Sequence, residues 1–557
     1  MIFESNASKF EYFLYFLISV MITAAPKYIQ TGNCSLNLEF FITFLWTFLA
    51  ICFLSQLLRT FFIKSALNPK EISNTYVNFI LNSKYSLLYI TLIILIFWLP
   101  IIISLYPGTL INDTWGQLNE YLTFFKHGEI QRGVLSDHHP FFDTLIMGFI
   151  ITPFGKYLHN WQLGIFTYTM IQSILTAFSF ALTVIYAHKK LHIKNGFSLF
   201  MIGFYAICPI FPVSVQTVSK DALFSWIYVI FILFFIEAIR TKCHSFNSLK
   251  YCIALILTAF FCTLTKKVGL YIILLSFISI TIFIPKNRSK TLVVLICTLF
   301  LSVGLTGIIK SSLGVTPGGK QEMFSLPFQQ TARYYRNYGK DTTKKEDAII
   351  GKVLNMKNLG ERYTPTNADP VKGYNDRGTT NQYKNYIKVW FKQGLRHPKI
   401  YFSAANAMLA GWFSFTEYRP LLDMSWHSQL NPKLIPNTTP NRKGFFKKSS
   451  AIVENVFDNL YNNPLFMLLL SYAFYATLLP AFIIATLWRK WEKEQIKYYW
   501  ITTIPLILSI LLGCWLAPVS IQFEGRRYLY PVIYTLPIML ALCKSVYQIK
   551  YSNKNNK

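Results

Sequence analysis

Residues 86–106 read SLLYITLIILIFWLPIIISLY, a stretch that carries no charged side chain and is mostly apolar. About twenty such residues are enough for a helix to cross the hydrocarbon core of a bilayer. Stretches of similar length and apolar character cover residues 221–239 and 291–309. The sequence therefore predicts a multi-pass membrane protein.

The composition of the chain agrees with this class. Hydrophobic residues make up 53% of its 557 residues and charged residues only 14%, whereas soluble domains are about a quarter charged. The formal net charge of +29, from 54 Lys and Arg against 25 Asp and Glu, is of the size that nucleic-acid-binding proteins carry. The apolar stretches nevertheless exclude a nucleic-acid module, a disordered chain and a secreted disulfide scaffold.

The apolar stretches and the charges of the loops between them predict a topology of about twelve transmembrane helices. Alternate spans place five loops and the C-terminal tail on one side, and these six segments hold 20 basic and three acidic residues. Short cytoplasmic loops are rich in Lys and Arg. Both termini are therefore expected in the cytoplasm. The predicted spans lie near residues 11–28, 38–62, 86–106, 163–187, 196–218, 221–239, 249–265, 268–285, 291–310, 465–487, 498–518 and 528–545.

Two further apolar segments, 141–158 and 400–415, would reverse this arrangement if they crossed the membrane, so we expect re-entrant or juxtamembrane helices on the outer face. Whether either segment spans fully is left open by the sequence. The fold class is an all-α polytopic membrane protein with a small α-rich outer lobe. Its expected parts are two extra N-terminal transmembrane helices (1–85), a transmembrane catalytic core with a first outer loop at 107–162 (86–310), an extracytoplasmic lobe (311–464), and C-terminal transmembrane helices with a cytoplasmic tail (465–557).

Ionisable residues gather where the predicted spans meet the outer face, and a charge near hydrocarbon is costly unless it is paired or functional. Five clusters contain the candidate site residues: Asp113; Asp137, His138 and His139; Lys220 and Asp221; Lys266 and Lys267; Arg526 and Arg527. Structural explanations exist for some of them, because Asp113 could cap a helix over 114–125, Lys220 could pair with Asp221, and Glu524 could pair with Arg526 or Arg527.

The functional interpretation of these clusters is that carboxylates and histidines supply general acid or base chemistry, while Lys and Arg bind a phosphate. Asp113, Asp221 and His138 are also candidate ligands for a divalent metal such as Mg or Mn, but their spacing is too irregular to specify one. The chemistry that suits such residues at a membrane surface is transfer of a sugar from a polyprenyl phosphate. That transfer needs a base for the acceptor hydroxyl and cations for the departing phosphate.

At these residues the chain resembles a family of uncharacterised bacterial multi-pass membrane proteins. The motifs that carry the resemblance are YPG…ND (Tyr106–Asp113), SDHHPFF (Ser136–Phe142), KDALF (Lys220–Phe224), FSLPFQQTAR (Phe324–Arg333), DPVK (Asp369–Lys372) and RRYLYP (Arg526–Pro531). More distantly, the arrangement is similar to that of the C-type glycosyltransferases, such as protein mannosyltransferases and aminoarabinose transferases.

The distant resemblance implies an inverting glycosyltransferase in the cell membrane whose site faces the extracytoplasmic side. It implies that Asp113 is the catalytic carboxylate, that His138 and His139 lie near the lipid phosphate or the acceptor, and that Asp221 is a secondary acidic residue. Lys266 and Lys267 replace the Arg-Asn pair of the close family, which leaves open which cation contacts the phosphate. The expected partners are a polyprenyl-phosphate-linked sugar, membrane lipid and an extracytoplasmic glycan or teichoic-type acceptor. A transporter or flippase for a lipid-linked saccharide is the alternative, and a non-catalytic scaffold is a third.

Overall fold

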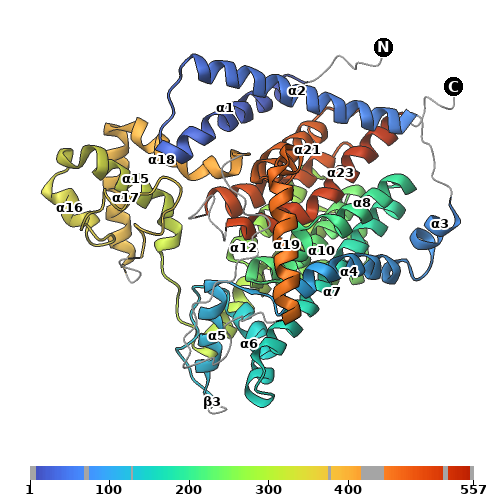
Figure 1. Cartoon of the computed structure of the whole chain (residues 1–557), viewed down its shortest axis with the longest axis horizontal. Coiled ribbons are helices and arrows are strands. Elements are labelled where there is room, and N and C mark those ends of the chain that lie inside the picture. Colours follow the sequence, from blue (N-terminus) through green and yellow to red (C-terminus); the bar gives the residue numbers. More distant parts are fainter. Residues whose placement is uncertain are drawn as a thin grey trace.

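The fold of the chain is a bundle of apolar helices with a small helical lobe at one end, as seen in a computed structural model that describes residues 8–67, 74–126, 129–373, 378–415, 444–517 and 525–551. Figure 1 shows the lobe of α15–α18 at one end of the bundle and α3 (Thr75–Asn82) with the C-terminal end of α23 (Tyr530–Tyr551) at the other. This separation is the one expected if the lobe and the basic loops face opposite sides of the membrane.

Seven helical segments among the described residues are long and apolar enough to cross a membrane: Lys9–Thr31 (α1), Leu38–Leu67 (α2), Ser86–Ser104 (α4), Trp161–Lys190 (α7), Lys220–Arg240 (α10), Arg288–Leu313 (α13, η2 and α14) and Gly525–Tyr551 (η10 and α23). Five shorter apolar helical segments are Asn195–Ile207 (α8), Leu249–Thr265 (α11), Lys267–Phe283 (α12), Phe474–Leu487 (η7 and α21) and Tyr499–Trp515 (η8, α22 and η9). Each of these segments overlaps one of the twelve predicted spans. The chain therefore has the helices of an integral multi-pass membrane protein.

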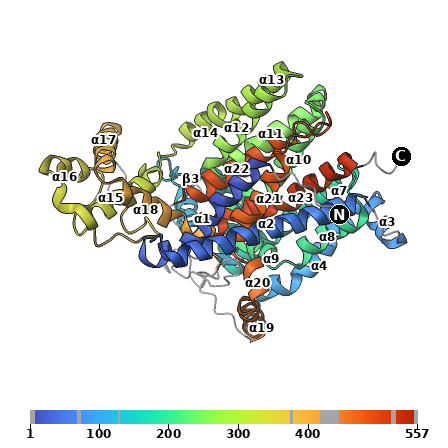
Figure 2. The same ribbon diagram turned by 90° about the horizontal axis from the view of Figure 1, so that it is seen from above.

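The buried core lies among α4, α7, α8, α10 and α23. Within it, the indole of Trp98 donates to the Tyr205 carbonyl at 2.9 Å, and the rings of Phe180 and Tyr205 stack with centroids 4.0 Å apart. Figure 2 shows α13 (Arg288–Leu299) and α14 (Thr306–Leu313) along one edge of the bundle, opposite α19 (Gly444–Asn462). The helix α10 is the most central of the long helices before α23, since 78% of its apolar window is buried.

The first outer loop contains α5 (Asn112–Phe124), a short hairpin of β2 (Phe125–Lys126) and β3 (Glu129–Ile130), and α6 (Phe141–Tyr157). The α6 helix packs on α5 and α7. The helix α18 (Pro398–Leu409) covers part of the other predicted re-entrant segment and continues into η5 (Ala410–Phe413). At 12 residues it rises about 18 Å, which is too short to cross the hydrocarbon core.

The lobe is built from η3 (Gln321–Phe324), α15 (Ser325–Tyr338), η4 (Gly339–Asp341), α16 (Lys344–Ile350), α17 (Thr380–Arg396) and α18. Its separate core contains Phe328, Ile350, Leu354 and Tyr386. Helices over this region agree with the helical periodicity of residues 322–338. The remaining helices are α9 (Ile210–Val215), η1 (His244–Asn247) and α20 (Pro464–Leu469).

Candidate functional site

A two-residue parallel ladder joins the loops that carry the first and third predicted clusters. Strand β1 (Thr109–Leu110) pairs with β4 (Thr217–Val218), with Leu110 opposite Val218. Because α5 and α10 begin directly after these strands, their first turns lie side by side. The Thr114 hydroxyl strengthens the junction by donating to the Val218 carbonyl. Asp113 and Lys220, which are 107 residues apart, are brought together in this way.

The carboxylate of Asp113 is bound by two cations. Its Oδ2 accepts from Lys220 Nζ at 3.1 Å and from Arg527 Nη1 at 2.6 Å, and about a quarter of the side chain is exposed. The expected capping role is not the one seen, because the residue before α5 is Ile111 and makes no side-chain cap, while Asp113 lies in the first turn. Asp113 is therefore held by side chains of two other segments rather than by its own helix.

The electrostatics of Asp113 follow from these contacts. Burial by itself would raise the pKa of the carboxyl, but the charges of Lys220 and Arg527 outweigh burial and hold the pKa of Asp113 well below its ordinary value. The group is therefore an ionised carboxylate at neutral pH. A carboxylate stabilised in this way accepts a proton poorly until its cations are engaged elsewhere.

His139 lies against the same lysine. Its Nδ1 accepts from Lys220 Nζ at 2.8 Å, and its Nε2 lies 4.0 Å from Asp113 Oδ1. Burial and the adjacent Lys220 charge lower the pKa of His139 to about 2, so the ring is neutral at physiological pH. Since Nδ1 accepts a hydrogen bond, we infer that the proton is on Nε2, on the side of Asp113.

A second ion pair lies behind the first. Asp221 is fully buried, and its Oδ1 lies 2.7 Å from Lys266 Nζ while its Oδ2 lies 3.6 Å from Arg527 Nε. Helix α10 is capped by Ser219, which accepts from Ala222 N at 3.2 Å, so Asp221 is not needed as a cap. Arg527 therefore connects the Asp113 and Asp221 carboxylates.

Asp137 forms a neighbouring cluster with two lysines. Its Oδ1 lies 3.0 Å from Lys310 Nζ and its Oδ2 lies 3.7 Å from Lys267 Nζ, which also donates to the Asp137 carbonyl. The Asp137 turn is fixed by pairing of Ser136 with Thr316, and by Gly318, where any Cβ would approach the Asp137 carbonyl to 2.5 Å. This cluster is more open than the first, because the side chain of Lys267 is 49% exposed.

Two of the predicted residues are not among these contacts. His138 is exposed, and its ring packs edge-on against His139 with centroids 4.5 Å apart. Arg526 is buried beside Tyr530. The structure thus brings together Asp113, His139, Lys220, Asp221, Lys266 and Arg527, with Asp137 and Lys267 adjacent; Glu524 lies outside the described residues.

Sequence reasoning missed one residue near the site, Lys310, and left a second, Asp143, out of the candidate site residues. Lys310 was overlooked because a lysine at the end of an apolar span resembles an ordinary interfacial residue. Asp143 in α6 has no exposed surface, and among the described residues neither of its oxygens has a hydrogen-bond partner. The sequence already places Asp143 one turn after His139, as a second carboxylate beside the two histidines, and an ionisable residue in an apolar helix is unusual.

A divalent metal fits these residues poorly. In the described ranges, no group of three or more His, Cys, Asp and Glu side chains has the arrangement of a metal site. Asp113 and Asp221 are each already neutralised by Lys or Arg. We therefore assign no chemical step to a metal.

No curated protein and no solved structure matches the chain. Residues 62–556 match DUF6020, which is described as a family of unknown function. The match covers most of the chain, including all the residues of the site described above and excluding α1 and most of α2. The chain therefore belongs to the DUF6020 family.

Proposed function

We propose that the protein is an integral membrane glycosyltransferase that moves a sugar from a polyprenyl-phosphate donor to an acceptor hydroxyl on the extracytoplasmic face. The observation that carries this proposal is the Asp113 carboxylate held between Lys220 and Arg527, where the first turns of α5 and α10 meet at the end of a bundle of apolar helices. A base and phosphate-binding cations are thereby combined at one point.

The charge balance of the site favours an anionic ligand. Lys220, Lys266 and Arg527 supply three positive charges against two negative charges from Asp113 and Asp221, and His139 is neutral. One positive charge is therefore in excess. The adjacent cluster of Lys267 and Lys310 around Asp137 has a second excess charge. A phosphate group is the ligand that Lys and Arg in such a cluster bind best.

The position of the site favours a lipid as the carrier of that phosphate. Helices α7, α10 and α23 are all long and apolar enough to cross the membrane, and the cations lie at the ends of α10 and α23. A polyprenyl phosphate can therefore place its phosphate on the cations while its hydrocarbon chain stays in the bilayer.

The proposed reaction uses Asp113 as a general base. When the donor phosphate engages Lys220 and Arg527, Asp113 loses its two stabilising cations and becomes a stronger base. It then accepts the proton of the acceptor hydroxyl, whose oxygen bonds to the anomeric carbon of the sugar. The bond between that carbon and the phosphate oxygen breaks, and polyprenyl phosphate leaves with the electron pair, stabilised by the cations. Attack on the face opposite the phosphate inverts the anomeric configuration.

The basic lobe suits an anionic acceptor. Residues 311–464 contain 22 basic and 11 acidic residues, and such an excess attracts anionic polymers or the membrane surface. A cell-envelope glycan or a teichoic-type polymer is therefore the proposed acceptor class.

The proposal is tested by transfer of radiolabelled sugar. Membranes that contain the wild-type protein or Asp113→Asn are incubated with a panel of polyprenyl-phosphate sugars and an envelope fraction, and labelled polymer is counted. We expect transfer with the wild type and loss of at least ~100-fold in the variant, the usual contribution of a general base. Movement of labelled lipid across the bilayer with no transfer in either protein would instead support the transporter alternative.

A further inference from the structure

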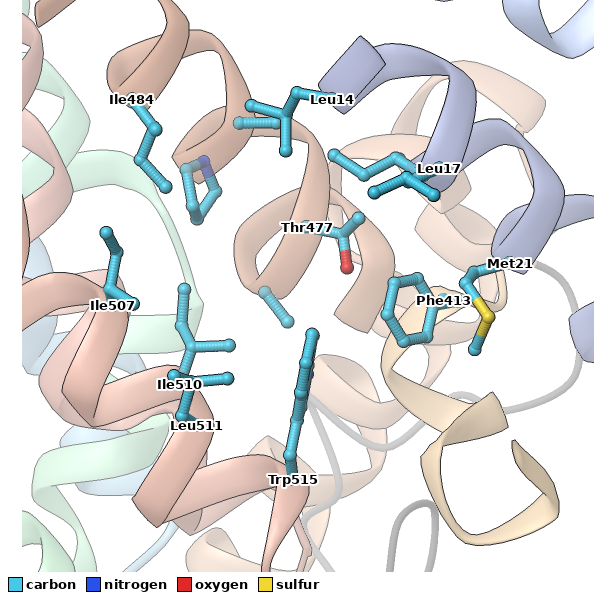
Figure 3. Close-up of a pocket in the computed structure, with 14 residues that line it drawn as sticks. Leu14, Leu17, Met21, Phe413, Thr477, Ile484, Ile507, Ile510, Leu511 and Trp515 are labelled. Carbon is cyan, nitrogen blue, oxygen red and sulfur yellow. The ribbon is translucent and has the colours of Figure 1, made fainter. Parts of the chain in front are cut away.

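An apolar cavity of about 200 Å³ lies between α1 and the C-terminal membrane helices. Figure 3 shows side chains from both sides converging on it, with Leu14, Leu17 and Met21 of α1 facing Ile510, Leu511 and Trp515 of η9 (Ser509–Trp515). The rest of its wall comes from η5, η7 (Phe474–Leu478), α21 (Leu479–Leu487) and α22 (Thr503–Leu508). The hydroxyl of Thr477, which also lines the cavity, donates to the Trp412 carbonyl. Apart from the Trp515 indole N–H, which has no hydrogen-bond partner among the described residues, the wall is apolar.

The α1 wall of this cavity is held firmly at both of its ends. At the first turn, Glu11 is 1% exposed and pairs with the equally buried Arg59 and with Arg489 at 2.8 Å. At the other end, Asn406 of the lobe donates to the Tyr28 hydroxyl at 3.1 Å. A buried ion triad is costly unless every charge is paired, so these contacts fix α1 in one place. The family match begins at residue 62, so this wall lies outside the matched part of the chain.

The cavity is connected to the cation cluster through η9. Trp515 lines the cavity, and the neighbouring Cys514 lies with its Sγ 3.6 Å from the Tyr528 carbonyl. The Tyr528 ring in turn lies under Lys266 Nζ, 5.8 Å from its centroid, and beside the Arg527 guanidinium. Cys514 and Tyr528 therefore form a chain of contacts from the wall of the apolar cavity to two cations of the proposed phosphate site.

We propose that this cavity holds part of the hydrocarbon chain of the polyprenyl-phosphate donor. The inference rests on the proposed function and adds a chain-binding site closed by α1. Bilayer hydrocarbon is as apolar as the cavity wall, so the cavity provides little hydrophobic gain. Its effect is to orient the lipid, so that the phosphate at the end of the chain is placed at Lys220 and Arg527.

Photocrosslinking tests this inference directly. A benzophenone amino acid is placed at Leu17, which lines the cavity, and in a control protein at Leu257, an exposed residue of α11. Each protein in liposomes is irradiated with radiolabelled polyprenyl phosphate. We expect labelling at Leu17 well above that at Leu257, removed by excess unlabelled polyprenyl phosphate and unchanged by the same amount of phosphatidylglycerol. Equal competition by phosphatidylglycerol would overturn the inference in favour of a general phospholipid chain.

A cavity-filling variant gives a second measurement. Ala481 is small and lines the cavity, so Ala481→Phe should fill part of it. The ratio of binding affinities for long-chain over short-chain prenyl phosphate should then fall by about tenfold, the scale on which a hydrophobic pocket discriminates ligands that differ by a small apolar group. Leu257→Phe should leave that preference unchanged.

The failure of this inference can be distinguished from failure of the proposed function. The chain site alone is overturned if polyprenyl phosphate binds and this binding depends on Lys220, but position 17 is not labelled and Ala481→Phe does not change the preference for long-chain over short-chain prenyl phosphate. Absence of any polyprenyl phosphate binding to the wild-type protein overturns the proposed function as well.

Discussion

Asp113 competes with the donor phosphate for the same two cations, and this competition gives the sharpest prediction. Its Oδ2 is 3.1 Å from Lys220 Nζ and 2.6 Å from Arg527 Nη1. Asp113→Asn removes the negative charge, keeps the side-chain shape and leaves both cations available. We therefore expect the variant to bind polyprenyl phosphate more tightly than the wild type while losing transfer.

The size of the affinity change follows from Coulomb's law. Two like charges about 4 Å apart repel by about 4 kcal/mol at the effective dielectric constant of a protein surface. Because Asp113 is about a quarter exposed, solvent and salt reduce this figure, and about 1.4 kcal/mol, or a tenfold gain in affinity, is the working expectation.

The assay measures equilibrium binding of radiolabelled polyprenyl phosphate to purified wild-type and variant protein in detergent at low salt. Asp341→Asn is the matched control, because it makes the same change at an exposed ion pair of the lobe, 3.0 Å from His397. The affinity of Asp341→Asn for polyprenyl phosphate should equal that of the wild type. Unchanged or weaker binding by Asp113→Asn would refute the competition between carboxylate and phosphate.

Three further outcomes are expected. The folded-state pKa of His139 is lowered from 6.5 to about 2, so below pH 6.5 the unfolded chain binds more protons and the free energy of unfolding should fall by up to about 1.4 kcal/mol per pH unit. Urea titrations of the wild type and His139→Gln should therefore diverge below that pH. Parallel plots of unfolding free energy against pH would contradict a neutral, buried His139. Glu11→Gln leaves Arg59 and Arg489 without their shared carboxylate and should cost about 3 kcal/mol of stability; a change below about 1 kcal/mol in the same titration would count against the triad. A cysteine at the exposed Lys357, in a Cys34→Ser background, should react with a membrane-impermeant maleimide in intact cells. Absence of labelling would contradict the prediction that the lobe lies on the extracytoplasmic face.

Much of the fold could be predicted from hydropathy, because a span such as α4 contains a run of apolar residues that only a membrane helix accommodates. The interruptions within spans could not be predicted in this way. Residues Phe300–Leu305, Phe474–Leu478 and Ser509–Trp515 are π-helical, and such local widening depends on packing against neighbouring helices rather than on a sequence signal.

The residues of the site could be identified individually, but their pairing could not. Asp113 and Lys220 were each visible as a charge at the end of a span, yet their contact depends on the β1–β4 ladder, which involves only two residues of each strand. Strands this short leave no periodic pattern in a sequence. Pairing of Lys220 with Asp221 was one structural explanation of that cluster, but Asp221 pairs with Lys266, which is distant in the sequence.

The central claim is that Lys220 and Arg527 bind the phosphate of a polyprenyl-linked donor beside Asp113. An experimental structure of the protein in lipid nanodiscs with polyprenyl phosphate tests this claim most directly. We predict phosphate density about 2.8 Å from Lys220 Nζ and the Arg527 guanidinium, the usual length of such charge-assisted hydrogen bonds. The Asp113 carboxylate should be displaced from at least one of these cations. Phosphate bound elsewhere, with both Asp113 ion pairs intact, would contradict it.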